Sequence, residues 1–379
     1  MKQIDIVKKM IPVTKPYLPP KEELQKYIDE IYDNNYLTNN GPLHKKLAME
    51  LCKYLGVDYL TLVVNGHSGL DIALKGLNIR GEVITTPFTF VSTVHALTLN
   101  GIEPVFCDIK RSDLTIDESK IESMITPKTT AIMPVHVYGH MCDVKRIEKL
   151  AKKYNLKVIY DAAHAFGVKY RGKALANYGD VSMLSFHATK IFNTIEGGAL
   201  IYNNGALSRV FDAYKNFGIE GPEKTDFVGG NAKMNEFQAA MGLANLAHMQ
   251  EIMNERKTLV ELYREQLNGL DGISYFVPEK MYDNYEYNYS YFPILIEKEY
   301  GKTRNELYDY LLENNVYARK YFYPIITQLG CYRKKYASIK LPVAEDVGRR
   351  VMCLPLYNGL SSESVLKICE LIKNFRENI

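Results

Sequence analysis

The sequence has no strong excess of charge and no long hydrophobic run. Its 379 residues include 47 basic and 44 acidic ones, which give a net charge of +3 and are spread along the chain. This balance argues against nucleic acid or an anionic membrane surface as a partner. Nowhere do about 18 apolar residues follow one another, as a membrane-spanning helix requires. The N-terminal stretch "MKQIDIVKKMIPVTKPYLPP" also lacks a continuous apolar segment with a small-residue cleavage site, so we expect a cytoplasmic protein.

The sequence also lacks the cysteine and histidine patterns of a metal site. Its six cysteines show no C-x-x-C spacing, which fits neither zinc binding nor a disulfide framework in a chain of this size. We expect reduced thiols, mostly buried. His136 and His140 have no companion ligands at suitable spacing, so no metal is predicted. Low-complexity tracts and fixed-period repeats are absent, which excludes solenoids and propellers. The cysteines are Cys52, Cys107, Cys142, Cys331, Cys353 and Cys369.

What the sequence does contain is an alternation of strand and helix patterns. The β-branched run 59–65 is followed by a glycine turn and by apolar residues at helical spacing, which predicts a strand, a turn and a helix. Similar apolar runs recur with helical patterns between several of them. This alternation predicts a mostly parallel sheet covered by helices on both faces. The further predicted strands are 82–86, 103–109, 129–139, 156–163, 180–186 and 198–203.

From about residue 231 the pattern changes. Residues 234–267 read as one long helical stretch, followed by a strand at 289–296 and by helices at 303–314 and 362–376. We therefore predict a large domain of residues 1–250 and a smaller α/β domain of residues 251–379.

Polar residues follow several predicted strands, where ligands of open α/β sheets bind. Asn65, Asp161 and Ser185 lie at such ends. The turn Gly66 to Gly69 opens a helix whose free N–H groups favour a phosphate, although a glycine at this place is often only a turn residue. Asp161 ends an apolar strand and needs a partner if it is to stay charged. A pyridinium nitrogen would be one such partner; capping of the next turn is the alternative.

Lys190, in the stretch "SFHATKIFNTIEGG", is the main catalytic candidate. A sheltered lysine loses solvation, its pKa falls, and the neutral amine can attack a carbonyl to form a Schiff base. A lone lysine would more simply be an exposed loop residue. Here, however, a phosphate turn, a strand-end carboxylate and a lysine follow one another along the chain. These are the three anchors that pyridoxal 5'-phosphate requires, so this cofactor is predicted.

Several motifs support this prediction by resemblance to a known family. They include "NGHSGLDIAL", "TTPFTFVSTVHAL", "YDAAHAFG", "SFHATKIFNTIEGG", "NAKMNEFQAAMG" and "ARKYFYP". With them the chain resembles the sugar aminotransferases of the DegT/DnrJ/EryC1/StrS group over nearly its full length. The resemblance implies the type I (aspartate aminotransferase-like) fold of pyridoxal-phosphate-dependent transferases.

The resemblance also implies roles for individual residues. Lys190 would hold the cofactor as a Schiff base and shuttle the proton, and Asp161 would keep the ring nitrogen protonated. Phe90 would stack on the ring; without the motif it would be taken for a core residue. His164, where many members have glutamine, would bond the ring hydroxyl. Ser185 and the backbone of Gly66 to Ser68 would hold the phosphate.

Three further positions are less settled by the resemblance. His67 stands where the family often has a phosphate-binding threonine, so Ser68 or backbone N–H groups would take over that contact. His187 matches a family histidine near the cofactor, but a histidine satisfied within its own turn fits as well. Asn231 resembles the residue that reaches the phosphate of the neighbouring subunit, which implies a homodimer with shared active sites. An N-cap of the following helix is the alternative for Asn231.

The implied reaction transfers an amino group from glutamate to a keto sugar. The stretches "IPVTKPYLPP" and "YLTNNGPLHKKL" resemble enzymes that aminate C4 of a nucleotide-linked 4-keto-6-deoxyhexose for surface polysaccharides. A small phosphorylated ketone such as dihydroxyacetone phosphate is an alternative acceptor. A non-catalytic pyridoxal-phosphate-binding regulator is an alternative of another class; the presence of Lys190 and the lack of a DNA-binding appendage argue against it.

Overall fold

The centre of the protein is one large twisted sheet. The structure, a computed structural model, describes residues 10–377. Within this range the central sheet has seven strands, in the order β1 (Tyr59–Val63), β9 (Gly198–Tyr202), β8 (Val181–Ser185), β5 (Lys157–Asp161), β4 (Thr129–Met133), β2 (Glu82–Thr85) and β3 (Glu103–Phe106). Strand β9 is antiparallel to both of its neighbours, whereas the other six strands share one direction. The expected mostly parallel sheet is confirmed, with β9 as the exception.

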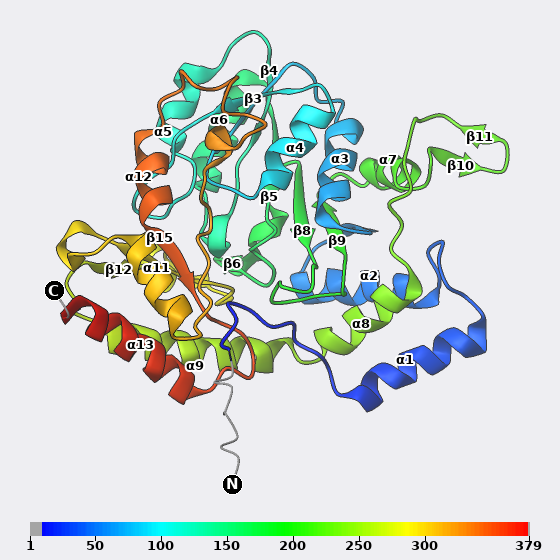
Figure 1. Cartoon of the computed structure of the whole chain (residues 1–379). Helices are drawn as coiled ribbons and strands as arrows, with labels where there is room; N and C mark the ends of the chain where they lie inside the picture. The colour runs from blue at the N-terminus through cyan, green and yellow to red at the C-terminus, as the bar shows by residue number, and fades with distance from the viewer. Residues whose placement is uncertain (1–9, 378–379) are drawn as a thin grey trace.

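Helices cover both faces of this sheet, as Figure 1 shows. Side chains of a strand point alternately to opposite faces, so Leu200 packs on one side of the sheet and Ile201 on the other. The first face carries α3 (Gly66–Gly76), α4 (Val91–Leu99) and α7 (Ala206–Tyr214), and the second carries α2 (Pro42–Leu55) and α6 (Val144–Tyr154). The large part of the chain is thus a three-layer α/β structure.

The C-terminal part forms a smaller α/β unit around an antiparallel sheet. Its strands have the order β12 (Ile273–Tyr275), β14 (Phe292–Ile296) and β15 (Val351–Leu354). Helices α9 (Met249–Leu267), α11 (Arg304–Glu313), α12 (Pro342–Arg350) and α13 (Ser362–Glu377) pack around it. Ile11, near the N-terminus, bridges to Val316 of this part. The division near residue 250 stays a prediction.

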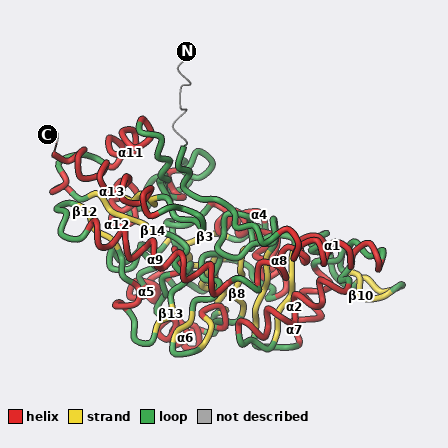
Figure 2. The backbone as a smooth tube through the Cα atoms, turned by 90° about the horizontal axis from the view of Figure 1, so that it is seen from below, coloured by secondary structure: helices red, strands yellow, loops and turns green. Residues whose placement is uncertain are grey.

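Shorter elements connect and extend the two parts. Figures 1 and 2 both show the hairpin of β10 (Ile219–Gly221) and β11 (Lys224–Thr225) projecting from the body of the molecule. A small sheet joins β13 (Tyr285–Glu286) of the C-terminal part to β6 (Lys169–Tyr170) and β7 (Lys173–Ala174) of the large part. The remaining helices are α1 (Lys21–Asn34), α5 (Glu118–Ile121), α8 (Glu236–Leu246) and α10 (Pro278–Met281).

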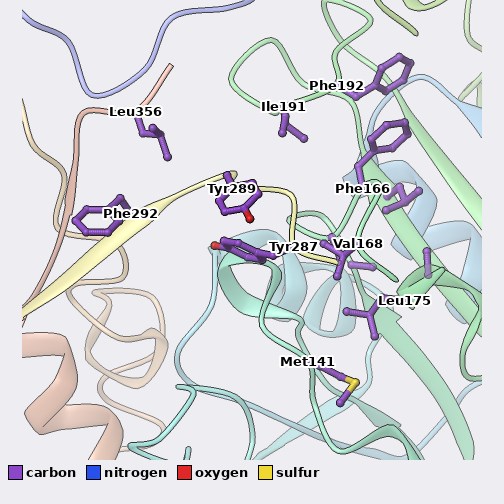
Figure 3. Close-up of a cluster of buried hydrophobic side chains, with 14 of the residues drawn as sticks. Met141, Phe166, Val168, Leu175, Ile191, Phe192, Tyr287, Tyr289, Phe292 and Leu356 are labelled. Atoms are coloured by element: carbon purple, nitrogen blue, oxygen red, sulfur yellow. The ribbon is translucent and has the colours of Figure 1, made fainter. Parts of the chain in front are cut away.

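The hydrophobic core is continuous between the two parts. Figure 3 shows Phe166 and Phe192 together with Tyr287 and Phe292, which come from opposite sides of residue 250. The rings of Phe166 and Phe192 stack with their centroids 4.4 Å apart. Because such close-packed contacts are lost when parts move, this core holds the two parts in one arrangement.

Two expectations about the chain can be compared with the structure. Among the described residues, none of the helices combines the length and the apolar composition needed to cross a membrane. All six cysteines are free thiols, and four of them are buried, as predicted. Residues 1–9, which contributed to the argument about an N-terminal leader, lie outside the described residues.

The prediction of one long helical stretch at 234–267 is wrong in one respect. It is divided into α8 and α9, with Ala247 and His248 between them. The hydrophobic pattern continues through this break, which is why periodicity alone missed it. Asn235 caps α8 through a capping box with Gln238, so Asn231 is not the N-cap considered as its alternative role.

Candidate functional site

The predicted strand-end residues meet at one edge of the sheet. Asp161 and Ser185 are the last residues of β5 and β8, and Asn65 follows β1 by two residues. These three strands share one direction, so their carboxyl ends lie together, and a cavity of about 470 Å³ opens there. Its lining includes Asn65, Gly66, His67, Ser68, Thr89, Phe90, Ser92, Asp161, His164, Ser185, His187, Lys190, Glu196, Tyr291, Arg319 and Tyr321.

The N-terminus of α3 forms one wall of this cavity. The Asn65 side chain accepts a hydrogen bond from the Ser68 N–H at 2.8 Å, and its carbonyl accepts the Gly69 N–H at 3.2 Å. The N–H groups of Gly66 and His67 remain for a ligand, because a helix supplies no partners to its first turn. A Cβ at Gly66 would lie 2.8 Å from the Met183 sulfur, so the Met183 side chain would have to move, whereas glycine allows α3 to pack closely on the sheet. The arrangement suits an anion such as phosphate.

Asp161 lies at the bottom of the cavity with 4% of its surface exposed. Its Oδ1 accepts the Ala163 N–H at 3.1 Å, and its Oδ2 accepts the Thr93 hydroxyl at 2.7 Å. Burial raises the pKa of Asp161, while these two hydrogen bonds and the charge of Lys190 lower it. The carboxylate is therefore held by donors on both oxygens and faces a cation.

Lys190 lines the cavity, and the residues that follow it in its loop are fixed by packing in the core. The next two residues, Ile191 and Phe192, are buried in the core shown in Figure 3. The Nζ of Lys190 donates to the Tyr291 hydroxyl at 3.3 Å and lies 5.8 Å from the centre of that ring. Burial lowers the pKa of Lys190 to about 8, although the charge of Asp161 acts in the opposite direction. At pH 7 about a tenth of the amine is thus neutral and nucleophilic, far more than for an ordinary lysine.

His164 presents a hydrogen-bond donor to the cavity. Its Nδ1 accepts the backbone N–H of Tyr138 at 2.9 Å. Burial lowers the pKa of His164 well below its usual value, and the charge of Lys190 acts in the same direction. The ring is therefore neutral, with its proton on Nε2.

Phe90 also lines the cavity and is 53% exposed. The reading of Phe90 as a core residue is wrong, because its neighbour Phe88 is the fully buried one. An exposed aromatic ring at the start of α4 offers a flat apolar surface to a ligand.

Two further predicted residues, His67 and His187, also line the cavity. His67 Nδ1 is 2.8 Å from the Ser92 hydroxyl, and this contact fixes its ring. The Nδ1 of His187 accepts the Thr189 N–H at 3.2 Å, which is the turn contact considered as an alternative. The Nε2 of His187 lies 3.6 Å from Glu196. Both readings of His187 thus remain compatible with its position.

Asn231 is the predicted residue that the fold does not bring into the cavity of its own chain. It is exposed, follows the β10–β11 hairpin and bridges to Asn216. His136 and His140, read as structural, are fully buried. Among residues 10–377, no group of three or more His, Cys, Asp or Glu side chains has the geometry to hold a metal ion.

Several residues that line the cavity or contact its lining escaped the sequence analysis. Thr93 and Tyr291 contact Asp161 and Lys190 from 68 and 101 positions away along the chain. Arg319 lies at the rim with its guanidinium 4.4 Å from the centre of the Tyr321 ring. The motif "ARKYFYP" contained a signal for Arg319, since it was among the stretches that resemble the family. Thr93 lies within "TTPFTFVSTVHAL", where only Phe90 was singled out.

Comparison with solved structures gives the class of fold. DesI, determined in the presence of its TDP-sugar product, superposes with a TM-score of 0.92 at 30% identity, covering 98% of this chain and 95% of that one. PseC of Helicobacter pylori, an aminotransferase of pseudaminic acid biosynthesis, gives a TM-score of 0.91 at 27% identity, covering 98% of this chain and all of that one. The fold is that of the type I pyridoxal-phosphate-dependent transferases, as expected.

Comparison of sequences gives the family. Residues 20–373 match the DegT/DnrJ/EryC1/StrS aminotransferase family. The dTDP-4-amino-4,6-dideoxy-D-glucose transaminase of Shigella dysenteriae is 44% identical over 370 residues, which is 98% of this chain and 100% of that one. The enzyme of the same name from Escherichia coli is 45% identical and covers 96% of this chain and 98% of its own. The chain belongs to the DegT/DnrJ/EryC1/StrS family and is an aminotransferase.

Proposed function

We propose that this aminotransferase uses pyridoxal 5'-phosphate to move an amino group from glutamate to C4 of a nucleotide-linked 4-keto-6-deoxyhexose. The observation that carries the proposal is the convergence of Lys190, Asp161 and the N-terminus of α3 on one cavity. A lysine amine, a carboxylate for the ring nitrogen and donors for a phosphate are the anchors of this cofactor.

The chemistry of the lining residues fits this cofactor. Asp161 offers a buried carboxylate to a pyridinium N–H, and the neutral His164 offers its Nε2–H to the ring hydroxyl. The free N–H groups of Gly66 and His67, with the Ser68 and Ser185 side chains, suit the phosphate. Phe90 provides the apolar ring surface on which the cofactor ring would stack.

The chain's own residues would then carry the proton transfers. When bound, the cofactor supplies a carbonyl carbon and an electron-withdrawing ring. The Nζ of Lys190 would hold the cofactor through this carbonyl and, when free, would take and return the substrate proton. A pKa of about 8 suits both tasks, because neither the amine nor the ammonium is rare near neutral pH. Asp161 would keep the ring nitrogen protonated.

The acceptor is proposed from the relatives and from the rim of the cavity. The two relatives that are 44% and 45% identical are named for a dTDP-linked 4-amino-4,6-dideoxy sugar. Arg319 is an exposed cation at the rim, and none of the ion pairs among the described residues involves it. An anionic group such as the diphosphate of a nucleotide sugar would pair with it.

We further propose a homodimer in which Asn231 completes the partner's site. Asn231 is exposed and does not line the cavity of its own chain, so its predicted contact with a phosphate requires a second copy. Large apolar side chains, Phe217 and Val228 among them, are exposed near it. Such surfaces are typical of protein contacts.

The cytoplasmic location that the sequence indicates stays a prediction.

The glutamate half-reaction tests the enzymatic reading. Glutamate added to the cofactor-bound protein without acceptor should convert the absorption spectrum from the aldehyde to the amine form of the cofactor, since the reaction proceeds in two halves. A panel of keto-sugar nucleotides and small keto-phosphates should then be tested for return of the first spectrum. If only dihydroxyacetone phosphate restored the first spectrum, this small keto-phosphate would replace the keto sugar as the proposed acceptor. If no amino acid changed the spectrum, the result would favour a non-catalytic regulator.

Mixing of two impaired variants tests the shared site. Lys190→Ala and Asn231→Ala chains, unfolded together and refolded, give heterodimers in which one site has both original residues. Activity should exceed the sum of the separately refolded variants. No recovery in heterodimers confirmed by mass would exclude Asn231 from the partner's site.

A further inference from the structure

A chain of two threonines ends on the carboxylate of Asp161. The Thr93 hydroxyl lies 2.7 Å from Asp161 Oδ2, and the Thr89 hydroxyl lies 2.8 Å from that of Thr93. All three side chains are buried, and Thr93 is 0% exposed. A carboxylate can only accept, so the Thr93 hydroxyl donates a hydrogen bond to Asp161. The Thr93 oxygen therefore accepts a hydrogen bond from the Thr89 hydroxyl, and the direction of both bonds is fixed.

These hydrogen bonds oppose the effect of burial on Asp161. Burial raises the pKa of this carboxyl, and the bonds from Thr93 and the Ala163 N–H lower it, as does the charge of Lys190. The two histidines near Asp161, His136 and His164, are neutral because burial lowers their pKa. The groups that keep the carboxylate charged are therefore two hydrogen-bond donors and one lysine.

Of these groups, the Thr93 hydroxyl and the Ala163 N–H contribute throughout a reaction, and Thr93 is the only side chain of the two. Lys190 loses its positive charge whenever its amine is neutral, as its role requires. The Ala163 N–H is part of the same turn as Asp161 and contacts only Oδ1. A short hydrogen bond to a buried charge is about twice as strong as a neutral one. We propose that Thr93, oriented by Thr89, is a positioning residue that keeps Asp161 ionised and directs its carboxylate toward the ring nitrogen of the cofactor.

The proposed role of Thr93 in cofactor binding rests on the proposed function. The effect of Thr93 on the pKa of Asp161, however, is present in the cofactor-free protein. It can therefore be tested separately from the proposed function. Replacement of Thr93 by valine keeps the side-chain shape and removes the donor. The carboxyl of Asp161 should then have a still higher pKa in the folded protein.

The sign of the expected effect follows from linkage. A carboxyl whose folded pKa is raised costs no stability at a pH below its unfolded pKa, and the cost develops fully above the folded pKa. Thr93→Val should therefore lose more thermal stability at about pH 7 than at about pH 5. Lys190 stays largely protonated in this window, because its own pKa is about 8. The measurement is the unfolding temperature of the cofactor-free protein at both pH values.

Thr85→Val is the matched control. Thr85 is also fully buried and donates a hydrogen bond of 2.7 Å, but to the uncharged carbonyl of Met133. Its replacement should lower the unfolding temperature by the same amount at both pH values. Thr93→Ser keeps the hydroxyl and should restore the wild-type pH profile even if it loses some packing.

The affinity for pyridoxal 5'-phosphate is the second readout. Thr93→Val should bind the cofactor on the order of tenfold more weakly, since a hydrogen bond to a charged group is lost. Thr89→Val should show a smaller effect of the same sign on both readouts, and it carries the test if Thr93→Val does not fold. A loss of stability for Thr93→Val that is equal at both pH values, with unchanged cofactor affinity, would overturn the proposal and leave Thr93 a packing residue. If only Thr89→Val folds, a wild-type pH dependence of its stability together with a wild-type cofactor affinity would also overturn the proposal.

Discussion

At the level of residues, the site is a half-buried amine and a buried carboxylate, each of which changes the pKa of the other. Burial favours the neutral form of both Lys190 and Asp161, whereas the charge of each favours the ionised form of the other. As a result, the amine of Lys190 loses its proton more easily than an ordinary lysine. The carboxylate of Asp161 is oriented by hydrogen bonds from Thr93 and the Ala163 N–H. This combination is typical of sites that form a Schiff base and protonate a pyridine ring.

The pKa of Lys190 can be measured directly. The rate at which pyridoxal 5'-phosphate attaches to the cofactor-free protein should rise with pH and reach half its maximum near the pKa of about 8, because the neutral amine reacts. Borohydride reduction and mass spectrometry measure the attachment. Asp161→Asn should shift the half-maximum to lower pH, since the charge that supports the ammonium is removed. A shift to higher pH would mean that Asp161 does not act on Lys190.

Phe90 and Phe88 provide a comparison between function and stability. Phe88 is fully buried, so Phe88→Ala should cost about 3–5 kcal/mol of unfolding free energy. Phe90 is 53% exposed, so Phe90→Ala should cost far less stability yet weaken cofactor binding. Denaturant titration and cofactor titration separate the two effects. Unchanged cofactor affinity in Phe90→Ala would remove this ring from the site.

Much of the site could be predicted because its main residues follow strands. Asp161 and Ser185 end predicted strands, and parallel strands bring such ends together. The supporting residues could not be predicted in the same way. The contacts of Thr93 and Tyr291 span 68 and 101 positions, and no local pattern indicates which distant side chain will face which carboxylate or amine.

At the level of elements, sequence patterns identified strands but not their direction. The pattern of β9 is that of a buried strand, which is the same for either direction, so its antiparallel pairing came only from the structure. The break between α8 and α9 was missed because both helices are apolar on the side that faces the core. The caps of helices are local features, and there the sequence contained a readable signal, N-E-F-Q, at the start of α8.

The two asparagines before α8 should behave differently. Asn235→Ala should lower the unfolding free energy by about 0.5–2 kcal/mol, because it removes the cap. Asn231→Ala should change stability by less than about 0.5 kcal/mol, since its side chain is exposed, but should weaken cofactor retention in the dimer. Denaturation and cofactor titration of both variants check this. Tight retention in the Asn231 variant would argue against the shared site.

At the level of the whole molecule, buried and exposed polar contacts join the large part to the C-terminal part. The buried carboxylate of Asp108 accepts the N–H groups of Val343 and Ala344 at the start of α12, at 3.1 and 2.9 Å. On the surface, Arg111 pairs with Glu297 and Asp346 of the C-terminal part. The sequence predicted two α/β units, but these links between them depend on the tertiary fold.

The buried link should matter more than the exposed one. Asp108→Ala leaves two buried N–H groups of α12 without their acceptor and should cost about 1–3 kcal/mol or more. Arg111→Ala should cost less than about 1 kcal/mol, because its ion pairs are partly exposed. Urea denaturation measures both. A larger loss for Arg111→Ala would show that the surface ion pairs dominate the contact between the parts.

The most direct test of the central claim follows the nitrogen atom itself. The protein is incubated with pyridoxal 5'-phosphate, ¹⁵N-labelled glutamate and a dTDP-linked 4-keto-6-deoxyhexose, and the sugar nucleotide is analysed by mass spectrometry. We expect ¹⁵N to appear in the sugar with the wild-type protein and not with Lys190→Ala. Label that stays in glutamate with the wild-type protein, or transfer by Lys190→Ala at a wild-type rate, would contradict the account.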